Sequence, residues 1–223
     1  MKRILCPNPK RKFEKGNVLF LILIAIALFG ALSFAMTKDR GSSMAYVQDQ
    51  RVMSDVSRLL THSGVMRATV HRMIGDGVTV AALSADEPIA DAATFEVAPH
   101  EHKIYHILGG GVTFTNNIGG ASDIEINKDA IITDVGATGA ADILLTTPVD
   151  DLSTCQEINM MLHGHTNIPE ITDAAYADLV GETAVTLSDA TTCNAAGGCD
   201  AVAFQCVVSN SGSYAYYHVL YAQ

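Results

Sequence analysis

Two groups of histidines have the residue type and spacing to bind a metal ion or transfer a proton. His100, His102 and His106 form one group, and His163 and His165 form the other. A His-x-His pair on a strand places both imidazoles on one face, where they could hold a metal. However, the first group follows a proline in a polar loop, and the second lies where a predicted helix ends and histidine often meets terminal carbonyl groups. We therefore expect no metal site at either group.

The motifs of common enzyme classes are missing from the sequence. There is no Gly-x-Ser-x-Gly nucleophile elbow, no phosphate-binding loop, no Gly-x-Gly-x-x-Gly and no His-Glu-x-x-His. We therefore expect no catalytic residue and no cofactor, and a protein that is not an enzyme. A metal-dependent hydrolase built on the histidine groups is the least favoured function class.

Four of the five cysteines lie in the final third of the chain, at Cys155, Cys193, Cys199 and Cys206. An even number of cysteines in an oxidising compartment suggests two disulfides, and four cysteines allow three connectivities. We favour Cys193 with Cys199, closing a short loop, and Cys155 with Cys206, tying a helix to a late strand. A zinc site is the rival interpretation, but no Cys-x-x-Cys pair is present.

Charge is distributed very unevenly along the chain. The formal net charge is −10, yet residues 73–223 carry only Lys103 and Lys128 against twenty acidic residues, a net charge of −18. Such a surface repels nucleic acid phosphates and anionic lipid head groups. We therefore expect no nucleic acid partner.

A basic leader, residues 1–16, runs directly into an apolar segment, residues 17–36, in which Ser33 is the only polar side chain after Asn17. At 1.5 Å per residue this segment matches a hydrocarbon core of roughly 30 Å. Six basic residues precede it and only Lys38 and Arg40 follow closely, which predicts a cytoplasmic N-terminus. The segment is predicted to span a membrane once. A cleaved secretory signal is less favoured, since its apolar core would be shorter.

The helix is predicted to continue past the apolar segment. No proline occurs between Pro9 and Pro88, and apolar residues recur at spacings of three and four up to Ile74. We expect one helix over residues 18–74. Gly41 and Gly64 weaken it, each by up to about 1 kcal/mol relative to alanine.

These features resemble those of the type IV pilins and pseudopilins of type II secretion. The resemblance rests on the basic leader ending in Lys15-Gly16, the apolar segment and the amphipathic continuation. It implies that a prepilin peptidase cuts between Gly16 and Asn17. The sequence departs from the family at Leu21, where members usually carry glutamate, and at Asn17, which is usually aromatic or methionine.

Sequence periodicity and turn residues predict an α+β, pilin-like fold in which a long N-terminal helix packs on an antiparallel sheet. Its parts are the leader (1–16), the spanning half of the helix (17–36), the amphipathic half (37–75) and an exported acidic head domain (76–223). Strands are expected at residues 104–108, 112–115, 130–134, 141–146, 183–187, 201–209 and 214–221, and a helix capped by Asp150 or Asp151 is expected to reach Leu162. Residues 123–127 alternate acidic and apolar types, as in an edge strand.

The resulting function prediction is a structural subunit of a pilus-like filament or secretion pseudopilus. Expected partners are copies of the chain, related subunits, the prepilin peptidase and the membrane. The predicted location is the inner membrane, with the head domain in the periplasm or outside the cell in an assembled filament. The alternative is a signal-anchored exported binding domain. The residues expected to pack between helices are Leu21, Ala25, Ala27, Gly30, Ala31 and Ser33.

Overall fold

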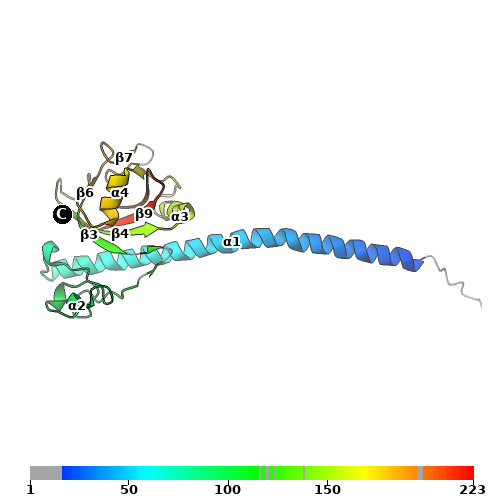
Figure 1. The fold of residues 1–223 in the computed structure, drawn as a ribbon, viewed down its shortest axis with the longest axis horizontal. Helices are drawn as coiled ribbons and strands as arrows, with labels where there is room; N and C mark the ends of the chain where they lie inside the picture. The colour runs from blue at the N-terminus through cyan, green and yellow to red at the C-terminus, as the bar shows by residue number, and fades with distance from the viewer. Residues whose placement is uncertain (1–16, 116, 119–120, 123, 138, 195–197) are drawn as a thin grey trace, which may run out of the picture. The chain divides into compact units, whose positions relative to one another are not determined.

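The computed structural model describes residues 17–115, 117–118, 121–122, 124–137, 139–194 and 198–223. The chain divides into two compact units, Met1–Asp49 and Gln50–Gln223. The first contributes the beginning of helix α1 (Asn17–Gly75), and the second contains the rest of α1 and all other elements (Figure 1). The leader, predicted at residues 1–16, lies outside the described residues.

Helix α1 extends over 59 residues and confirms the predicted helix within one residue at each end. Its expected membrane-spanning half is not found, because within the described residues no helix combines the length and the apolar character needed to cross a membrane. The predictions of a membrane-spanning helix and of a single-pass inner-membrane location are therefore wrong.

In the second unit, one stripe of α1 is buried at spacings of three and four residues. Its members are Val56, Leu59, Ser63, Met66, Val70 and Met73, none more than 2% exposed. This spacing is the signature of a helix with one face against a core. The three arginines between them, Arg58, Arg67 and Arg72, lie on the exposed side.

A mixed sheet forms the body of the second unit. Its longest path runs in the order β1-β2-β4-β9-β8-β5-β7, and β3 pairs with both β4 and β6. The strands are β1 (Asn117–Ile118), β2 (Ala121–Ser122), β3 (Glu125–Ile132), β4 (Asp142–Val149), β5 (Glu170–Ile171), β6 (Val185–Leu187), β7 (Cys193–Asn194), β8 (Phe204–Ser209) and β9 (Tyr214–Tyr221).

The two faces of the sheet bury separate apolar clusters. Alternation along β4 sends Ile143 and Leu145 to the cluster that contains the α1 stripe, and Leu144 to the cluster that contains Leu179. Leu179 belongs to α4 (Asp173–Val180), which was not expected from the sequence. Helices α1 and α4 therefore cover opposite faces of the central strands (Figure 1).

Helix α3 (Leu152–His163) agrees with the predicted helix and its cap. The Asp151 carboxylate accepts a hydrogen bond from the Thr154 backbone N–H at 2.8 Å, which satisfies one free donor of the first turn. Gly164 ends the helix at φ 74°, a left-handed conformation that glycine adopts without steric cost. Cys155 and Ile158 turn toward the same cluster as the α1 stripe.

Two features of the predicted sheet are corrected. The sheet is not purely antiparallel, because β3 pairs with β6 and β5 pairs with β8 in parallel. Residues 104–108 and 112–115 form no strands, because the glycines between them fold the chain back on itself. The backbone N–H of Gly110 donates to Lys103 O, and that of Gly111 donates to His106 O, each at 2.9 Å.

The remaining short helices precede the sheet. They are the 3-10 turns η1 (Val80–Ala82) and η2 (His100–His102) and the single helical turn α2 (Ala92–Phe95). Residues 125–127, within the stretch expected to form an edge strand, belong to β3 and pair with β4 on one side, whereas β6 pairs with β3 farther along, at residues 130–132. The strand predictions for residues 130–134, 141–146, 183–187, 201–209 and 214–221 overlap β3, β4, β6, β8 and β9.

Replacing Leu59 by alanine is expected to lower the free energy of unfolding by about 3 kcal/mol, because the side chain is fully buried and leaves a cavity. Urea unfolding of the purified chain measures the change. Arg51→Ala is the matched control on the same helix, since its side chain is 83% exposed, and it should shift stability by less than about 0.5 kcal/mol. Equal losses in the two variants would show that the stripe does not hold α1 on the sheet.

Candidate functional site

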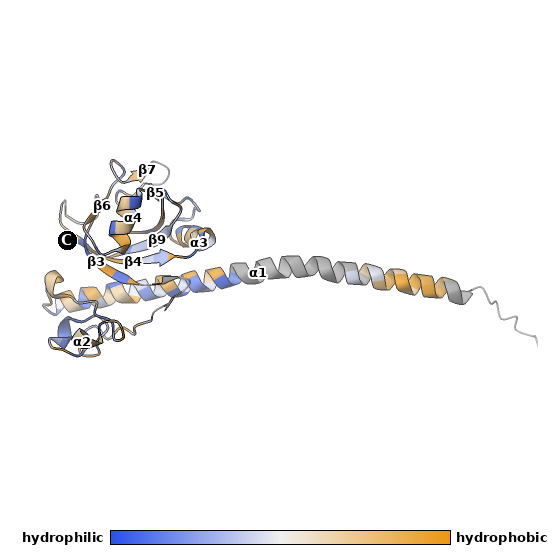
Figure 2. Cartoon of the chain, in the orientation of Figure 1, coloured by the Kyte–Doolittle hydropathy of each residue, from blue (hydrophilic) through white to orange (hydrophobic). Residues whose placement is uncertain are grey.

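Helix α1 exposes a continuous band of large apolar side chains in the first unit. Their exposed fractions run from 40% at Ile24 to 73% at Phe29. The band consists of Phe20, Leu21, Ile22, Leu23, Ile24, Ile26, Leu28 and Phe29. Figure 2 shows this part of α1 as a hydrophobic segment. A helix that is apolar all round is normally covered by other protein or lipid, so this band is the strongest candidate for an interaction site.

Small residues lie among the large ones of this band, at most of the positions expected to pack between helices. Ala25, Ala27, Gly30 and Ala31 are exposed, and so are Leu21 and Ser33. A side chain built on Gly30 would have no heavy atom within 4 Å. The helix surface is therefore low enough here for another backbone to approach closely.

The predicted cleavage position falls at the start of the helix: Gly16 lies outside the described residues, and Asn17 is the first residue of α1.

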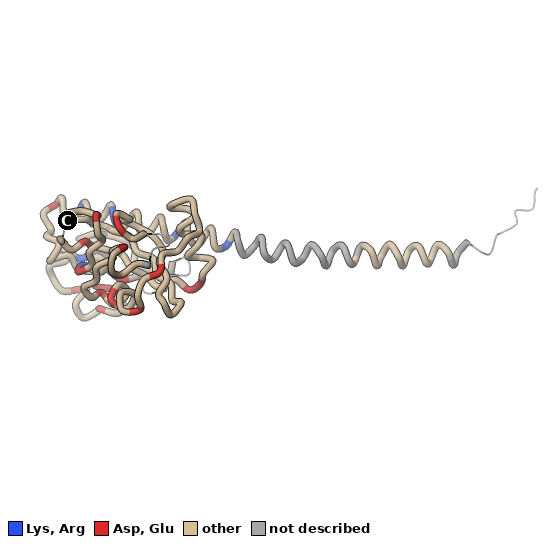
Figure 3. The backbone as a smooth tube through the Cα atoms, turned by 90° about the horizontal axis from the view of Figure 1, so that it is seen from above, with Lys and Arg blue, Asp and Glu red and all other residues tan. Residues whose placement is uncertain are grey.

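In the described part of the second unit the exposed cationic side chains lie on α1, where Arg51 and Arg58 each lie near Asp55, and Arg72 lies near Asp76 and donates to the carbonyls of Gly109 and Gly110. In the second unit α1 carries Arg51, Arg58, Arg67 and Arg72. By contrast, Lys103 donates to the carbonyls of Thr94, Phe95 and Val97, and Lys128 donates to Leu83 O at 2.9 Å. Figure 3 shows acidic residues distributed over the remainder of this unit. The predicted acidic surface thus has both of its lysines engaged internally.

The first histidine group does not converge as a metal site. The rings of His100 and His106 stack with centroids 4.3 Å apart, which does not aim their nitrogens at a common point. His106 Nδ1 accepts a hydrogen bond from the Leu108 backbone N–H at 3.1 Å, and His106 Nε2 lies 3.9 Å from a Glu96 oxygen. His102 is in the η2 turn. Both nitrogens of His106 thus already face protein atoms.

The second histidine group belongs to an aromatic row on the surface of the second unit. His163 stacks on His165 and on Phe204, and one of its ring nitrogens shares a hydrogen bond with Phe204 O at 2.9 Å. Phe204 in turn meets His218 edge-on, with centroids 5.3 Å apart. The group therefore packs α3 against β8 and β9.

A buried polar chain joins α1 to β9. Ser63 Oγ lies 3.2 Å from Tyr216 Oη, which lies 3.1 Å from His218 Nδ1. Burial, together with charge repulsion from Arg67, lowers the pKa of His218 to about 4. Burial raises the pKa of Tyr216. The sequence analysis did not predict this series of hydrogen bonds. The polar Ser63 at a core position of the α1 stripe was a signal that a buried hydrogen-bond partner is present.

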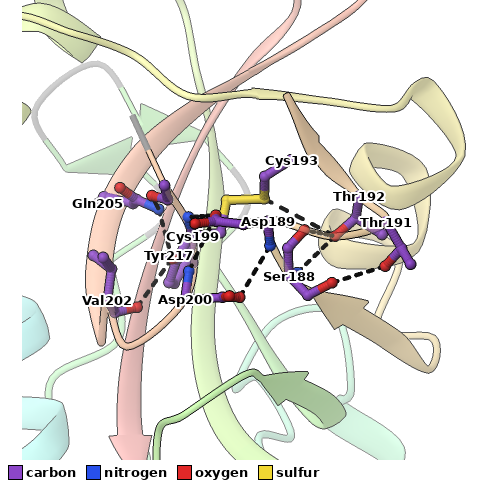
Figure 4. The surroundings of a disulfide bond; sticks show 11 residues. Ser188, Asp189, Thr191, Thr192, Cys193, Cys199, Asp200, Val202, Gln205 and Tyr217 are labelled. Atoms are coloured by element: carbon purple, nitrogen blue, oxygen red, sulfur yellow. Dashed lines mark hydrogen bonds between the residues drawn. A yellow bond between two sulfur atoms is a disulfide. The ribbon is translucent and has the colours of Figure 1, made fainter. Parts of the chain in front are cut away.

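Both disulfides join the cysteines that the sequence favoured. Cys155 of α3 is bonded to Cys206 of β8, and Cys193 of β7 is bonded to Cys199. Figure 4 shows the second disulfide beside Asp189, whose carboxylate accepts hydrogen bonds from the backbone N–H groups of Cys199 and Asp200. Asp189 and the two sulfurs lie within 4.8 Å of one another, but sulfurs in a disulfide are not thiolate ligands. This cluster is therefore structural.

Comparison with known proteins gives no relative from which a function could be transferred. No family model matches the chain, and neither does any curated protein or solved structure.

Stability is expected to fall as the pH drops from about 6.5 to about 4, in part because of His218. Between these values the unfolded chain binds a proton at His218 that the folded chain rejects, so the loss is complete once the pH is below the folded pKa. The contribution should reach about 2 kcal/mol after allowance for partial solvent screening. Denaturant titrations at several pH values measure it.

His218→Phe should flatten this part of the stability profile, because the variant has no group to protonate there. His71→Phe is the control, since His71 is exposed on α1 and its ring meets that of Tyr221 in a T-shaped contact. A wild-type slope that survives in His218→Phe would assign the pH dependence to other groups.

Proposed function

We propose that this chain is a structural, non-catalytic subunit of a filament similar to type IV pili or secretion pseudopili. Copies assemble by packing their α1 helices together after the leader is removed between Gly16 and Asn17. A prepilin peptidase is the proposed processing enzyme, and other copies or related subunits are the proposed partners. The second unit is then carried by the assembled helices as a compact, disulfide-bonded domain.

The exposed apolar band of α1, from Phe20 to Phe29, is the observation that carries this proposal. Fully burying a large apolar side chain gains roughly 1.5–3 kcal/mol, and each of these eight is at least 40% exposed. Covering the band could therefore contribute several kcal/mol per subunit, which is enough to drive association. A helix of another copy offers a matching surface, because it carries the same large and small residues in the same order.

The small residues give the packing its geometry. Ala25, Ala27 and Gly30 lower the helix surface, so that the larger residues of a neighbouring helix can enter between them. Leu21 adds apolar area at the position where related pilins usually carry glutamate. Assembly of this chain would therefore depend less on a charge pair at that position and more on apolar contact.

Protein isolated from the native host is expected to begin at Asn17. The physical reason is that the charged leader, if retained, would place its basic residues next to the apolar band of a neighbouring helix. Intact-mass measurement of the purified protein gives the answer. A chain that begins at Met1 in assembled material would contradict the processing step.

Replacing Ala27 by glutamate is expected to abolish filaments while leaving the second unit folded, because a charge would be buried between apolar helices. Electron microscopy counts the filaments, and thermal unfolding checks the fold. Ala27→Ser should keep most of the filaments, and Ala174→Glu on the exposed side of α4 is the matched charge control. Wild-type numbers of filaments from Ala27→Glu would refute packing through this surface.

A further inference from the structure

The second unit has a groove of about 740 Å³ along the outer side of α1. One wall is four turns of α1, and the other consists of residues 112–115 and β1. Two of its apolar side chains, Met53 and Val65, are 46% and 49% exposed. Arg58 is the cationic side chain of the lining, accompanied by His62. The groove thus combines apolar contact area with positive charge.

A segment of complementary character lies elsewhere in the second unit. Residues 87–97 expose Ile89 at 72% and Val97 at 57%, and they also contain Glu87, Asp91 and Glu96. The Glu96 side chain is 74% exposed. The segment therefore offers two large apolar side chains within a negatively charged stretch, which matches the chemistry of the groove.

From this complementarity we infer that the groove of one copy receives residues 87–97 of a second copy. The inference rests on the proposed function and adds a specific contact between subunits to it. Residues 73–223 carry a net negative charge, so this region of one copy repels the same region of a neighbouring copy. Its two lysines donate hydrogen bonds to backbone carbonyls of their own chain. Arginine on α1 of the next copy is then the available counter-charge in the described residues.

The geometry of the contact suits a filament. The groove and residues 87–97 are different surfaces of the same chain, so each copy can use its groove for one neighbour and its segment for another. Contacts of this head-to-tail kind propagate when the rotation between copies does not close a ring. Arg58 already lies 3.9 Å from Asp55, but its side chain is 64% exposed and such a surface pair is weak. Arg58 can therefore leave Asp55 and pair with an acidic residue of another copy at a small cost in free energy.

Charge reversal of both partners tests the contact in the full-length chain. Arg58→Glu should reduce assembly about tenfold, and so should Glu96→Arg, because each places like charges together. The double variant Arg58→Glu with Glu96→Arg should recover most of the wild-type level. Arg67→Glu is the matched control, since Arg67 is exposed on the same helix but does not line the groove, and it should assemble like the wild type. Failure of the double variant to recover would overturn the inference.

A photo-crosslinking amino acid at Val65 locates the occupant directly, in concentrated solutions of the full-length chain whether or not filaments form. Mass spectrometry of the crosslinked dimer should find the attachment within residues 87–97 of the other copy. Attachment to Phe20–Phe29 of that copy, attachment elsewhere or the absence of a crosslinked dimer would overturn the inference. If the wild type forms filaments but the crosslink is absent or lies elsewhere, the proposed function stands and only this contact is refuted. If the crosslink lies within residues 87–97 but the chain never forms filaments, only the proposed function is contradicted.

Discussion

The second unit depends on one stripe of α1 packed against the centre of a twisted sheet. The buried residues of the stripe recur every three or four positions, which places them on one face of α1. Successive side chains of β4 point to opposite faces of the sheet, so one set meets α1 and the other meets α4. Ser63 interrupts this apolar contact, and its hydroxyl group finds a partner in Tyr216. The disulfide between Cys155 and Cys206 then ties α3 to β8 on the same side.

The same helix carries a second apolar surface that no described residue covers. In the second unit the apolar residues of α1 form a stripe, because a sheet takes up one side and water the other. Between Phe20 and Phe29 the apolar residues surround the helix, and all eight large ones are exposed. One helix therefore combines an apolar stripe that the sheet covers with an apolar band that partner molecules would cover in the proposed assembly. This contrast supports a subunit of an assembly more than an independent binding domain.

Electrostatics place a further constraint on any assembly of this chain. Residues 73–223 carry a net charge of −18, and both of their lysines are directed at backbone carbonyls. Like-charged domains can be brought together only if counter-charge is supplied at their contacts. Arg58, on the exposed side of α1 and in the lining of the groove, is suitably placed to supply it. An interface between subunits would then be sensitive to ionic strength, whereas the buried core would not.

The sequence by itself determined the bounds of α1 and the hairpin of β8 and β9 and narrowed the cap of α3 to Asp150 or Asp151, because periodicity, turn residues and capping are local signals. It favoured both disulfide pairs among three connectivities, and the structure decided between them. It also suggested a membrane-spanning segment that the described helix does not contain. Only the tertiary structure decided the parallel pairings of β6 and β5, the turn of residues 104–112 and the polar chain from Ser63 to His218. These features depend on which distant residues meet, and the groove beside Arg58 depends on the same long-range packing.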